Sequence, residues 1–255
     1  MNDYLKTTGL SVGYDGKALI RDVALSVQRG KIVTLIGPNG SGKSTILKTV
    51  ISQLPAIEGA VFLDGEDLRA RSRQDTAKRM AIVMTARMDP ELMTCRDVVS
   101  SGRYPYTGRL GILREEDKKI VEDSLRQVDA LDFSDKPFQA ISDGQRQRIL
   151  LARAICQQPQ TMGLDAPASF LDIRYKIELL SILRRLAAER GMSVLLSLHE
   201  IDLAAKISDK IVCVDGDKIS AVGTPEEIFR GDTVRDLYDI SRGDYNLLFG
   251  SVELE

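Results

Sequence analysis

The sequence is poor in the features that mark secreted, cysteine-metal and membrane-spanning proteins. Its three cysteines, Cys95, Cys156 and Cys213, lie far apart with no CxxC pair, so neither a disulfide framework nor a cysteine metal cluster is expected. The longest apolar stretches, such as 194–198, fall far short of the roughly 20 residues that cross a bilayer. No basic N-terminal segment precedes an apolar stretch, so no secretory signal is predicted. We therefore expect a protein of the reducing cytosol that meets a membrane only through a partner.

A surplus of positive charge is also lacking. Lysine and arginine number 35 against 37 aspartates and glutamates, giving a net charge of −2. This balance, with no basic arm and no long heptad insertion, argues against a nucleic-acid partner. At 255 residues with 43% hydrophobic side chains, the chain can bury a substantial core. We expect one domain that carries an inserted subdomain.

The order of apolar runs and helical patterns predicts an α/β fold. Residues 31–36 form a short apolar run, a glycine-rich loop follows, and a helix is predicted from Ser44 to Leu54. Further strands are predicted at 80–84, 161–165 and 193–198. The helical pattern at 172–190 separates the last two of these strands, and strand, helix, strand implies a parallel sheet.

Other segments flank this core. Short alternating runs at 14–30 and 59–65 predict a small antiparallel sheet, and 211–223 reads as two strands around an Asp-Gly turn. A helical tail closes the chain. Helical spacing dominates the middle of the chain. The predicted organisation is a core formed by 1–85 and 159–255, with a helical subdomain at about 86–158.

The glycine-rich loop matches the pattern G-x-x-x-x-G-K-[ST]. Glycines let successive backbone N–H groups close around phosphate oxygens, the lysine adds positive charge, and the serine hydroxyl can bind Mg²⁺. A strand before the loop and a helix after it are the context that this pattern needs. ATP with Mg²⁺ is therefore the expected ligand. The residues of this phosphate loop are Gly37, Asn39, Gly40, Ser41, Gly42, Lys43, Ser44 and Thr45.

Four further features follow the phosphate loop in order. They are the segment Ile141-Ser-Asp-Gly-Gln145, Asp165 at a strand end, Asp172, and His199 after another strand. This ordered set resembles the ATPase subunit of ABC transporters over nearly the whole chain. The resemblance implies a P-loop NTPase core with a flanking antiparallel β subdomain and an inserted helical subdomain. It also implies a second ATPase domain as a partner.

The resemblance implies a role for each of these residues. The signature segment consists of Ser142, Asp143, Gly144 and Gln145, which would contact the nucleotide held by the partner's phosphate loop. Ser142 and Gly144 would meet its γ-phosphate, and Asp143 replaces a usual glycine. Asp172 belongs to the same nucleotide-contacting set. On its own, the signature segment reads as a helix start, and Asp165 could equally cap a helix.

Three more residues carry roles implied by the family. Asp165 would hold Mg²⁺, and His199 would sense the γ-phosphate, although a lone histidine is more often a satisfied core residue. Tyr14 would stack on adenine, with an ordinary surface tyrosine as the alternative.

Two catalytic positions depart from the family. Ala166 follows the Mg²⁺ aspartate where the family has a glutamate that polarises water, and Thr85 stands where a glutamine is usual. Loss of a positioned general base typically costs about 10² to 10⁴ in rate. We predict that ATP binding is retained and that hydrolysis at this chain's own site is impaired, unless another carboxylate such as Glu200 substitutes. A heterodimer with a complete partner could still hydrolyse ATP, whereas a homodimer would have two impaired sites.

The segment Ser101–Tyr106 resembles a stretch found in ATPases of ferric-siderophore, haem and cobalamin importers. It implies an energy-coupling subunit bound to transmembrane permease subunits at the cytoplasmic face of the membrane, and indirectly to a substrate-binding protein. A short aromatic turn can also arise from packing alone. The alternative function is a soluble ABC-type ATPase or a nucleotide-sensing regulatory subunit without a transport role.

Overall fold

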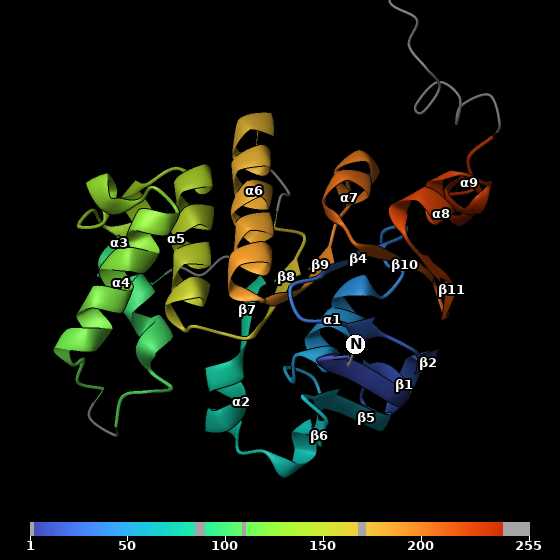
Figure 1. Cartoon of the computed structure of the whole chain (residues 1–255), viewed down its shortest axis with the longest axis horizontal. Coiled ribbons are helices and arrows are strands. Elements are labelled where there is room, and N and C mark those ends of the chain that lie inside the picture. Colours follow the sequence, from blue (N-terminus) through green and yellow to red (C-terminus); the bar gives the residue numbers. More distant parts are fainter. Residues whose placement is uncertain (1–2, 85–89, 109–110, 168–171, 242–255) are drawn as a thin grey trace, which may run out of the picture.

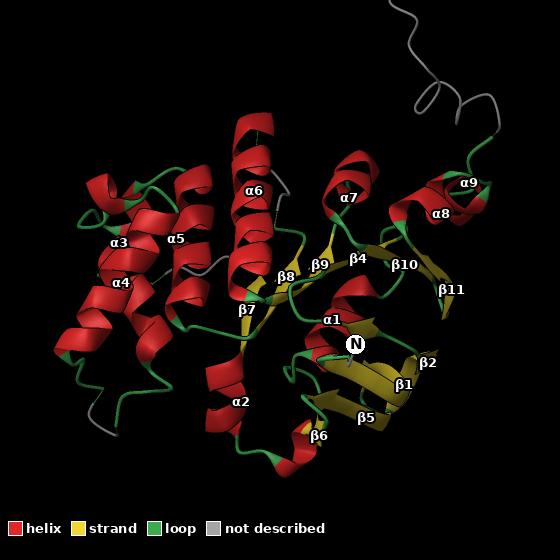
Figure 2. Cartoon of the chain, viewed as in Figure 1, coloured by secondary structure: helices red, strands yellow, loops and turns green. Residues whose placement is uncertain are grey.

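The computed structural model describes residues 3–84, 90–108, 111–167 and 172–241, which fold as two sheets and a group of helices (Figures 1 and 2). The larger sheet has six strands. In spatial order they are β11 (Lys218–Gly223), β10 (Lys210–Asp215), β4 (Ile32–Ile36), β9 (Ser193–Ser197), β8 (Thr161–Asp165) and β7 (Met80–Met84). Strands β10 to β7 are parallel and β11 is antiparallel.

The smaller sheet is antiparallel, as the sequence predicts. Its strands are β2 (Lys17–Val23), β1 (Leu5–Tyr14), β5 (Glu58–Leu63) and β6 (Glu66–Asp67), with β3 (Ser26–Val27) paired to β1.

The helices divide into groups that Figure 1 separates across the view. Helices α3 to α5 form one side, α6 stands beside the parallel strands, and α7 to α9 lie at the other side. Their bounds are α1 (Lys43–Val50), α2 (Arg73–Arg79), α3 (Cys95–Ser100), α4 (Glu115–Gln127), α5 (Asp143–Cys156), α6 (Ile173–Arg190), α7 (Ile201–Ile207), α8 (Pro225–Phe229) and α9 (Thr233–Leu237). The 3₁₀ turns are η1 (Leu68–Ala70), η2 (Ser101–Arg103), η3 (Leu131–Phe133) and η4 (Phe138–Ala140). None of the helices in the described ranges has the length and hydropathy needed to span a lipid bilayer.

Two apolar cores share the parallel sheet. Along β4, Ile32 and Ile36 point into the core beneath the larger helices, whereas Val33 and Leu35 point into the core that contains α1 and the antiparallel sheet. A parallel strand covered on both faces has no solvent-facing side, and this explains why β4 is mainly apolar and buried throughout. The layers are therefore helices, parallel sheet, and α1 with the smaller sheet.

The helix after the phosphate loop is shorter than predicted. It was expected to reach Leu54, but α1 ends at Val50. Ser52 adopts a left-handed φ of 61°, and Pro55 disfavours helical backbone at the residue before it. The remaining predicted strands and the helix at 172–190 agree with β7, β8, β9 and α6 within one residue.

Gly163 looks unfavourable in the sequence because glycine weakens a strand interior. The structure gives a packing reason for it: a Cβ at this position would lie 3.0 Å from side-chain carbons of Ile51, at the end of α1. Strand β8 is buried along its whole length. The glycine therefore lets α1 approach β8 closely.

A second close approach generates a prediction. A Cβ at Gly102 in η2 would lie 2.3 Å from the backbone oxygen of Arg153 in α5. We expect Gly102→Ala to lower the free energy of unfolding by about 1 to 3 kcal/mol through overpacking, as measured by chemical denaturation. Gly108→Ala is the matched control, because a Cβ there meets nothing within 4 Å. Equal stability of the two variants would contradict the packing account.

Candidate nucleotide site

The phosphate loop joins β4 to α1, and its glycines are required by both space and conformation. Gly37, Gly40 and Gly42 have φ values of 150°, 80° and 93°. A Cβ at Gly37 would lie 2.1 Å from the Val214 oxygen, and a Cβ at Gly42 would lie 2.6 Å from Ile20 Cδ1. Asn39 and Gly40 are exposed at the tip of the loop. The loop therefore presents backbone N–H groups at the N-terminus of a helix, which is a favourable place for anions.

Lys43 lies inside this loop. Its Nζ donates to the carbonyl oxygens of Gly37 and Pro38, each at 2.7 Å, and lies 3.5 Å from Ser41 Oγ. Burial lowers the pKa of Lys43, and the nearby Asp165 carboxylate opposes that shift. The Lys43 ammonium is thus held inside the loop, where its positive charge would neutralise the phosphate oxygens of a bound nucleotide.

Asp165 ends β8 and is the focus of the polar contacts. Its Oδ1 accepts hydrogen bonds from Ser44 Oγ and from Ser197 Oγ, both at 2.7 Å. Asp165 is buried, so each of these bonds satisfies an oxygen that water reaches poorly. One carboxylate oxygen therefore ties together the ends of β8 and β9 and the start of α1.

The donor set at Asp165 fits Mg²⁺. Magnesium prefers hard oxygen ligands and usually takes only one or two from the protein, with the remainder from phosphates and water. Ser44 and Asp165 supply one hydroxyl and one carboxylate within hydrogen-bonding distance of each other. Within the described ranges, no group of three or more His, Cys, Asp or Glu side chains is placed to hold a metal ion. Thr85, the third predicted ligand, lies outside the described residues.

Ala166 has an unusual backbone. Its φ is 45°, in the left-handed region that a residue with a Cβ adopts at a cost of about 1 kcal/mol. Its N–H donates to Ser197 Oγ at 2.9 Å. The backbone here is held by β9 next to Asp165. Ala166, the position at which a glutamate is expected from the family resemblance, therefore lies directly beside Asp165 and carries no carboxylate.

His199 and Glu200 follow β9. His199 is exposed, so the alternative of a satisfied core histidine is wrong. Glu200 accepts a hydrogen bond from Lys176 Nζ of α6. Burial works to raise the pKa of Glu200, but Lys176, a backbone hydrogen bond and His199 together hold the pKa below its ordinary value. Glu200 is thus a carboxylate engaged by a cation, which makes it a weak base.

Tyr14 lies beside the phosphate loop. Its hydroxyl is 3.1 Å from Thr45 Oγ1, and its side chain is 49% exposed. The ring therefore presents an open face next to the loop. This geometry suits stacking of a flat ligand.

The signature segment starts α5. Ser142 is the N-cap, its Oγ accepts from Gln145 N at 3.3 Å, and Gln145 Oε1 accepts from Ser142 N at 3.0 Å. This capping box agrees with the simple reading of the sequence as a helix start. Asp143 pairs with Arg146 at 3.4 Å. A Cβ at Gly144 would lie 3.2 Å from the Tyr175 ring.

The signature segment lies apart from the phosphate loop, and Asp172 begins another helix. Asp172 is the N-cap of α6 and accepts from Tyr175 N at 3.0 Å. In Figure 1, α5 stands at the opposite side of α6 from α1. The chain thus carries two separate predicted nucleotide-contacting surfaces, as a composite site between two chains requires.

Sequence reasoning missed two residues of the site. Ser197 bridges Asp165 and Ala166, and Tyr238, just beyond α9, accepts a hydrogen bond from Gly37 N at 3.0 Å. Ser197 could have been suspected as a polar residue at the end of an apolar strand. No local signal marks Tyr238, because 201 residues separate it from Gly37.

Comparison with known proteins decides the family. The ABC transporter family matches residues 20–169. The chain belongs to this family of ATP-binding proteins. An ABC transporter ATP-binding protein of Methanocaldococcus jannaschii is 43% identical over 98% of this chain and 87% of the relative.

Other ABC relatives have more specific names. The iron(3+)-hydroxamate import ATP-binding protein FhuC of Bacillus subtilis is 35% identical over 92% of this chain and 88% of its own length. The achromobactin transport ATP-binding protein CbrD of Dickeya dadantii is 36% identical over 91% of this chain and 86% of its own length. Among solved structures, a dimeric ABC transporter cassette aligns with a TM-score of 0.75 at 23% identity, covering 87% of this chain and 98% of that one. The ABC fold is therefore established independently by sequence and by structure.

The bridge through Ser197 gives a prediction. Ser197→Ala removes a donor to Asp165 and an acceptor for Ala166 N, so the carboxylate loses its fixed orientation. We expect ATP affinity in the presence of Mg²⁺ to fall by about three- to tenfold, the cost of one hydrogen bond, with a smaller loss in EDTA, both measured by titration calorimetry. Ser193→Ala is the control, because its hydroxyl bonds Gln28 O at the other end of β9. Equal losses with and without Mg²⁺ would contradict this role.

Proposed function

We propose that this chain is the ATP-binding, energy-coupling subunit of an ABC importer for an iron-siderophore, haem or cobalamin. The observation that carries the proposal is the agreement of its relatives, which include import proteins for iron(3+)-hydroxamate and cobalamin. The phosphate loop binds the phosphates of ATP, and Tyr14 stacks on adenine. Ser44 and Asp165 hold Mg²⁺, which supplies charge neutralisation at the β- and γ-phosphates when bound. His199 contacts the γ-phosphate.

The proposed working unit is a dimer of ATPase domains. The signature segment of one chain, together with Asp172, completes the nucleotide site of the other, and the partner is either a second copy or a related chain. ATP then acts by holding the two domains together. Closure moves the helical segment at about 86–158, and this movement is the work done on the permease.

We propose that hydrolysis at this chain's own site is impaired. Ala166 cannot accept a proton, and the Glu200 carboxylate is engaged by Lys176. Ser197 and Asp165 bond to each other, so neither oxygen of that bond is a free base for water. The loop supports ATP binding, while among the described residues neither Ala166 nor Glu200 offers a free carboxylate as a base.

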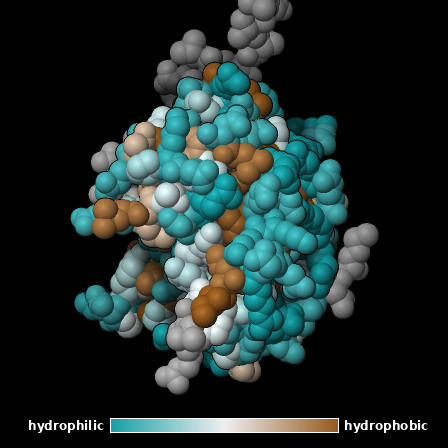
Figure 3. All heavy atoms as spheres, turned by 90° about the vertical axis from the view of Figure 1, so that its left-hand side faces the viewer, coloured by the Kyte–Doolittle hydropathy of each residue, from teal (hydrophilic) through white to brown (hydrophobic). Residues whose placement is uncertain are grey.

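The proposed permease contact is a groove between the core and the helical segment. It has a volume of about 1170 Å³ and is lined by residues of the 53–61 segment, α2 and α5, including Leu54, Ala77 and Leu150. Tyr104 is 60% exposed in the same part of the molecule, near Arg153 at the wall of the groove. The adjoining face is mainly hydrophilic, with apolar side chains in a broken band down its middle (Figure 3). Through this contact the subunit would sit at the cytoplasmic side of the membrane, with a substrate-binding protein reached only through the permease.

Restoring the missing carboxylate tests the catalytic proposal. We expect Ala166→Glu to raise Mg-ATP hydrolysis by about 10² to 10⁴, measured as phosphate release, while ATP affinity changes little. Ala166→Gln is the matched control, because it has the same size and the same backbone strain but no base. The unaltered chain should bind ATP and turn it over slowly.

Other outcomes of this experiment are decisive as well. Rapid turnover by the unaltered chain would refute the impaired site, and its loss in Glu200→Gln would identify Glu200 as the base. A gain in Ala166→Gln equal to that in Ala166→Glu would show that side-chain size, not proton transfer, limits the rate.

Loss of permease binding tests the transport proposal. On coexpression with its membrane partner, Tyr104→Glu should reduce copurification by about tenfold or more, as expected for an aromatic anchor. Ile177→Glu on α6 is the control, because Ile177 is also exposed and apolar. Retention of the partner by Tyr104→Glu would remove the proposed contact.

A further inference from the structure

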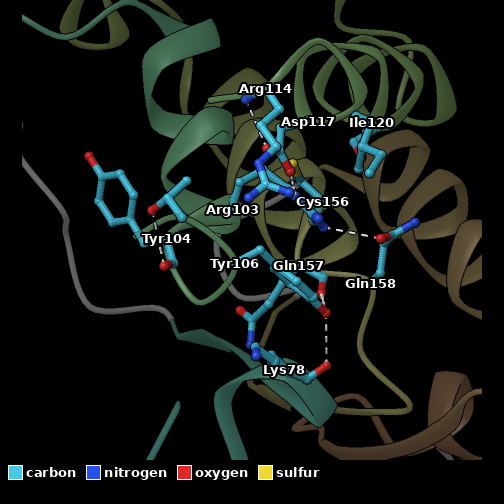
Figure 4. Close-up of polar contacts among 12 residues, drawn as sticks. Lys78, Arg103, Tyr104, Tyr106, Arg114, Asp117, Ile120, Cys156, Gln157 and Gln158 are labelled. Carbon is cyan, nitrogen blue, oxygen red and sulfur yellow. Dashed lines mark hydrogen bonds and ion pairs between the residues drawn. The ribbon is translucent and has the colours of Figure 1, made fainter. Parts of the chain in front are cut away.

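The segment Ser101–Tyr106 contains a buried charge that the proposed docking role does not explain. Figure 4 shows Arg103 turned into the molecule while Tyr104 points away. Arg103 Nε donates to Asp117 Oδ1 at 2.9 Å, and both side chains are less than 10% exposed. A buried ion pair is a weak contributor to stability because desolvation offsets its attraction. The arginine therefore needs a further explanation.

Arg103 also contacts the end of α5. Its Nη1 donates to the Cys156 carbonyl at 2.9 Å and to Gln158 Oε1 at 3.1 Å. Cys156 is the last residue of α5, so its carbonyl has no partner within the helix. A guanidinium here satisfies that carbonyl and meets the negative end of the helix dipole. Arg103 thus clamps the C-terminal end of the helix whose other end is the signature segment.

Tyr106 extends the clamp to the core. Its ring lies 3.9 Å from the Arg103 guanidinium, and its hydroxyl lies 3.2 Å from the Lys78 carbonyl and 3.0 Å from the Gln157 carbonyl. Lys78 belongs to α2, directly before β7. Gln157 Nε2 in turn donates to the Met80 carbonyl at 2.6 Å. The C-terminal end of α5 is therefore joined to the junction of α2 and β7.

The N-terminal half of α5 is held differently. Its contacts with α6 include the partly exposed ion pair Arg148–Glu178, and partly exposed ion pairs contribute little to stability. Two arginines of this half also reach backbone carbonyls, Arg146 Nη2 that of Gln139 at 2.8 Å and Arg148 Nη1 that of Asp129 at 3.4 Å, but both bonds are exposed to water. The bond from Arg103 to the Cys156 carbonyl is buried, so the C-terminal end of the helix is held in the drier environment.

We propose that Arg103, supported by Asp117 and Tyr106, is a positioning residue that makes the C-terminal end of α5 the pivot for the signature segment. Helix α5 has 14 residues and is about 21 Å long, so about 10° of slack at the pivot moves its far end by about 4 Å. That displacement exceeds the tolerance of a hydrogen bond to a phosphate. The pivot is a property of this chain alone; only its consequence for a partner's nucleotide rests on the proposed function.

The test measures the position of the signature end in the full chain. Lys6→Cys on β1 and Ala140→Cys, three residues before Asp143, both place a nitroxide label at an exposed position. The native cysteines are buried, and burial raises the pKa of Cys156 and Cys213 to about 11, which keeps these thiols unreactive. Double electron–electron resonance then measures the distribution of distances between the two nitroxide labels.

Arg103→Lys keeps the positive charge but loses the planar fork that reaches Asp117 and the Cys156 carbonyl together. We expect the distribution of distances between the two labels to shift or broaden by about 4 Å, which is the displacement of the far end of α5 for about 10° of slack at the pivot. Arg96→Lys is the matched control, because Arg96, on the neighbouring helix α3, forms an exposed ion pair with Asp135. A merely structural role would lower the melting temperature without changing the distribution of the folded molecules.

The second variant, Tyr106→Phe, keeps the ring over Arg103 and removes the hydroxyl that reaches Lys78. It should also broaden the distribution of distances between the labels. If Arg103→Lys fails to fold, this variant alone tests whether the C-terminal end of α5 is the pivot. Distributions that match the parent in both folded variants would overturn the pivot. ATP titration of the unaltered chain is read separately: absence of binding would sink the proposed function and leave the distance comparison valid.

Discussion

The candidate site depends on the meeting of strand ends at one edge of the parallel sheet. Strands β4, β8 and β9 run in the same direction, so the phosphate loop, Asp165 and Ser197 arrive at the same place from distant parts of the chain. The Asp165 carboxylate then receives hydroxyl hydrogen bonds from both neighbours. Because a buried carboxylate is costly without such partners, this arrangement fixes the position of α1 relative to the sheet. The same hydrogen bonds to Asp165 therefore also set the direction of the α1 dipole and of the backbone N–H groups at the start of α1.

Much of this could be predicted because the controlling signals are local. The phosphate loop carries its own pattern, and the mainly apolar sequences of β4 and β9 fit strands that are buried along their whole length. Ser142 and Gln145 form the capping box that their spacing allows. The sequence was less informative where long-range packing decides the outcome: the end of α1, the contact of Tyr238 with Gly37, and the inward direction of Arg103.

Arg103 illustrates the limit most clearly. An exposed aromatic turn and a buried clamp can share the same six residues, and only the partners distinguish them. Those partners come from α2, α4 and the end of α5, which no sequence pattern connects to Ser101–Tyr106. The segment divides its residues between two tasks, with Tyr104 facing outward and Arg103 and Tyr106 facing inward.

Gly163 has a consequence for Ser44 and Asp165, the two residues proposed to hold Mg²⁺. The absent side chain sets how closely α1 lies against β8, since a Cβ would press on Ile51. Helix α1 is short and stiff, so displacement at Ile51 is transmitted along it to Ser44, and β8 ends at Asp165. The distance between the Ser44 hydroxyl and the Asp165 carboxylate therefore depends on the lack of a side chain at Gly163, at the other end of the helix. The absence of a side chain at Gly163 therefore also influences the width of the proposed Mg²⁺ site.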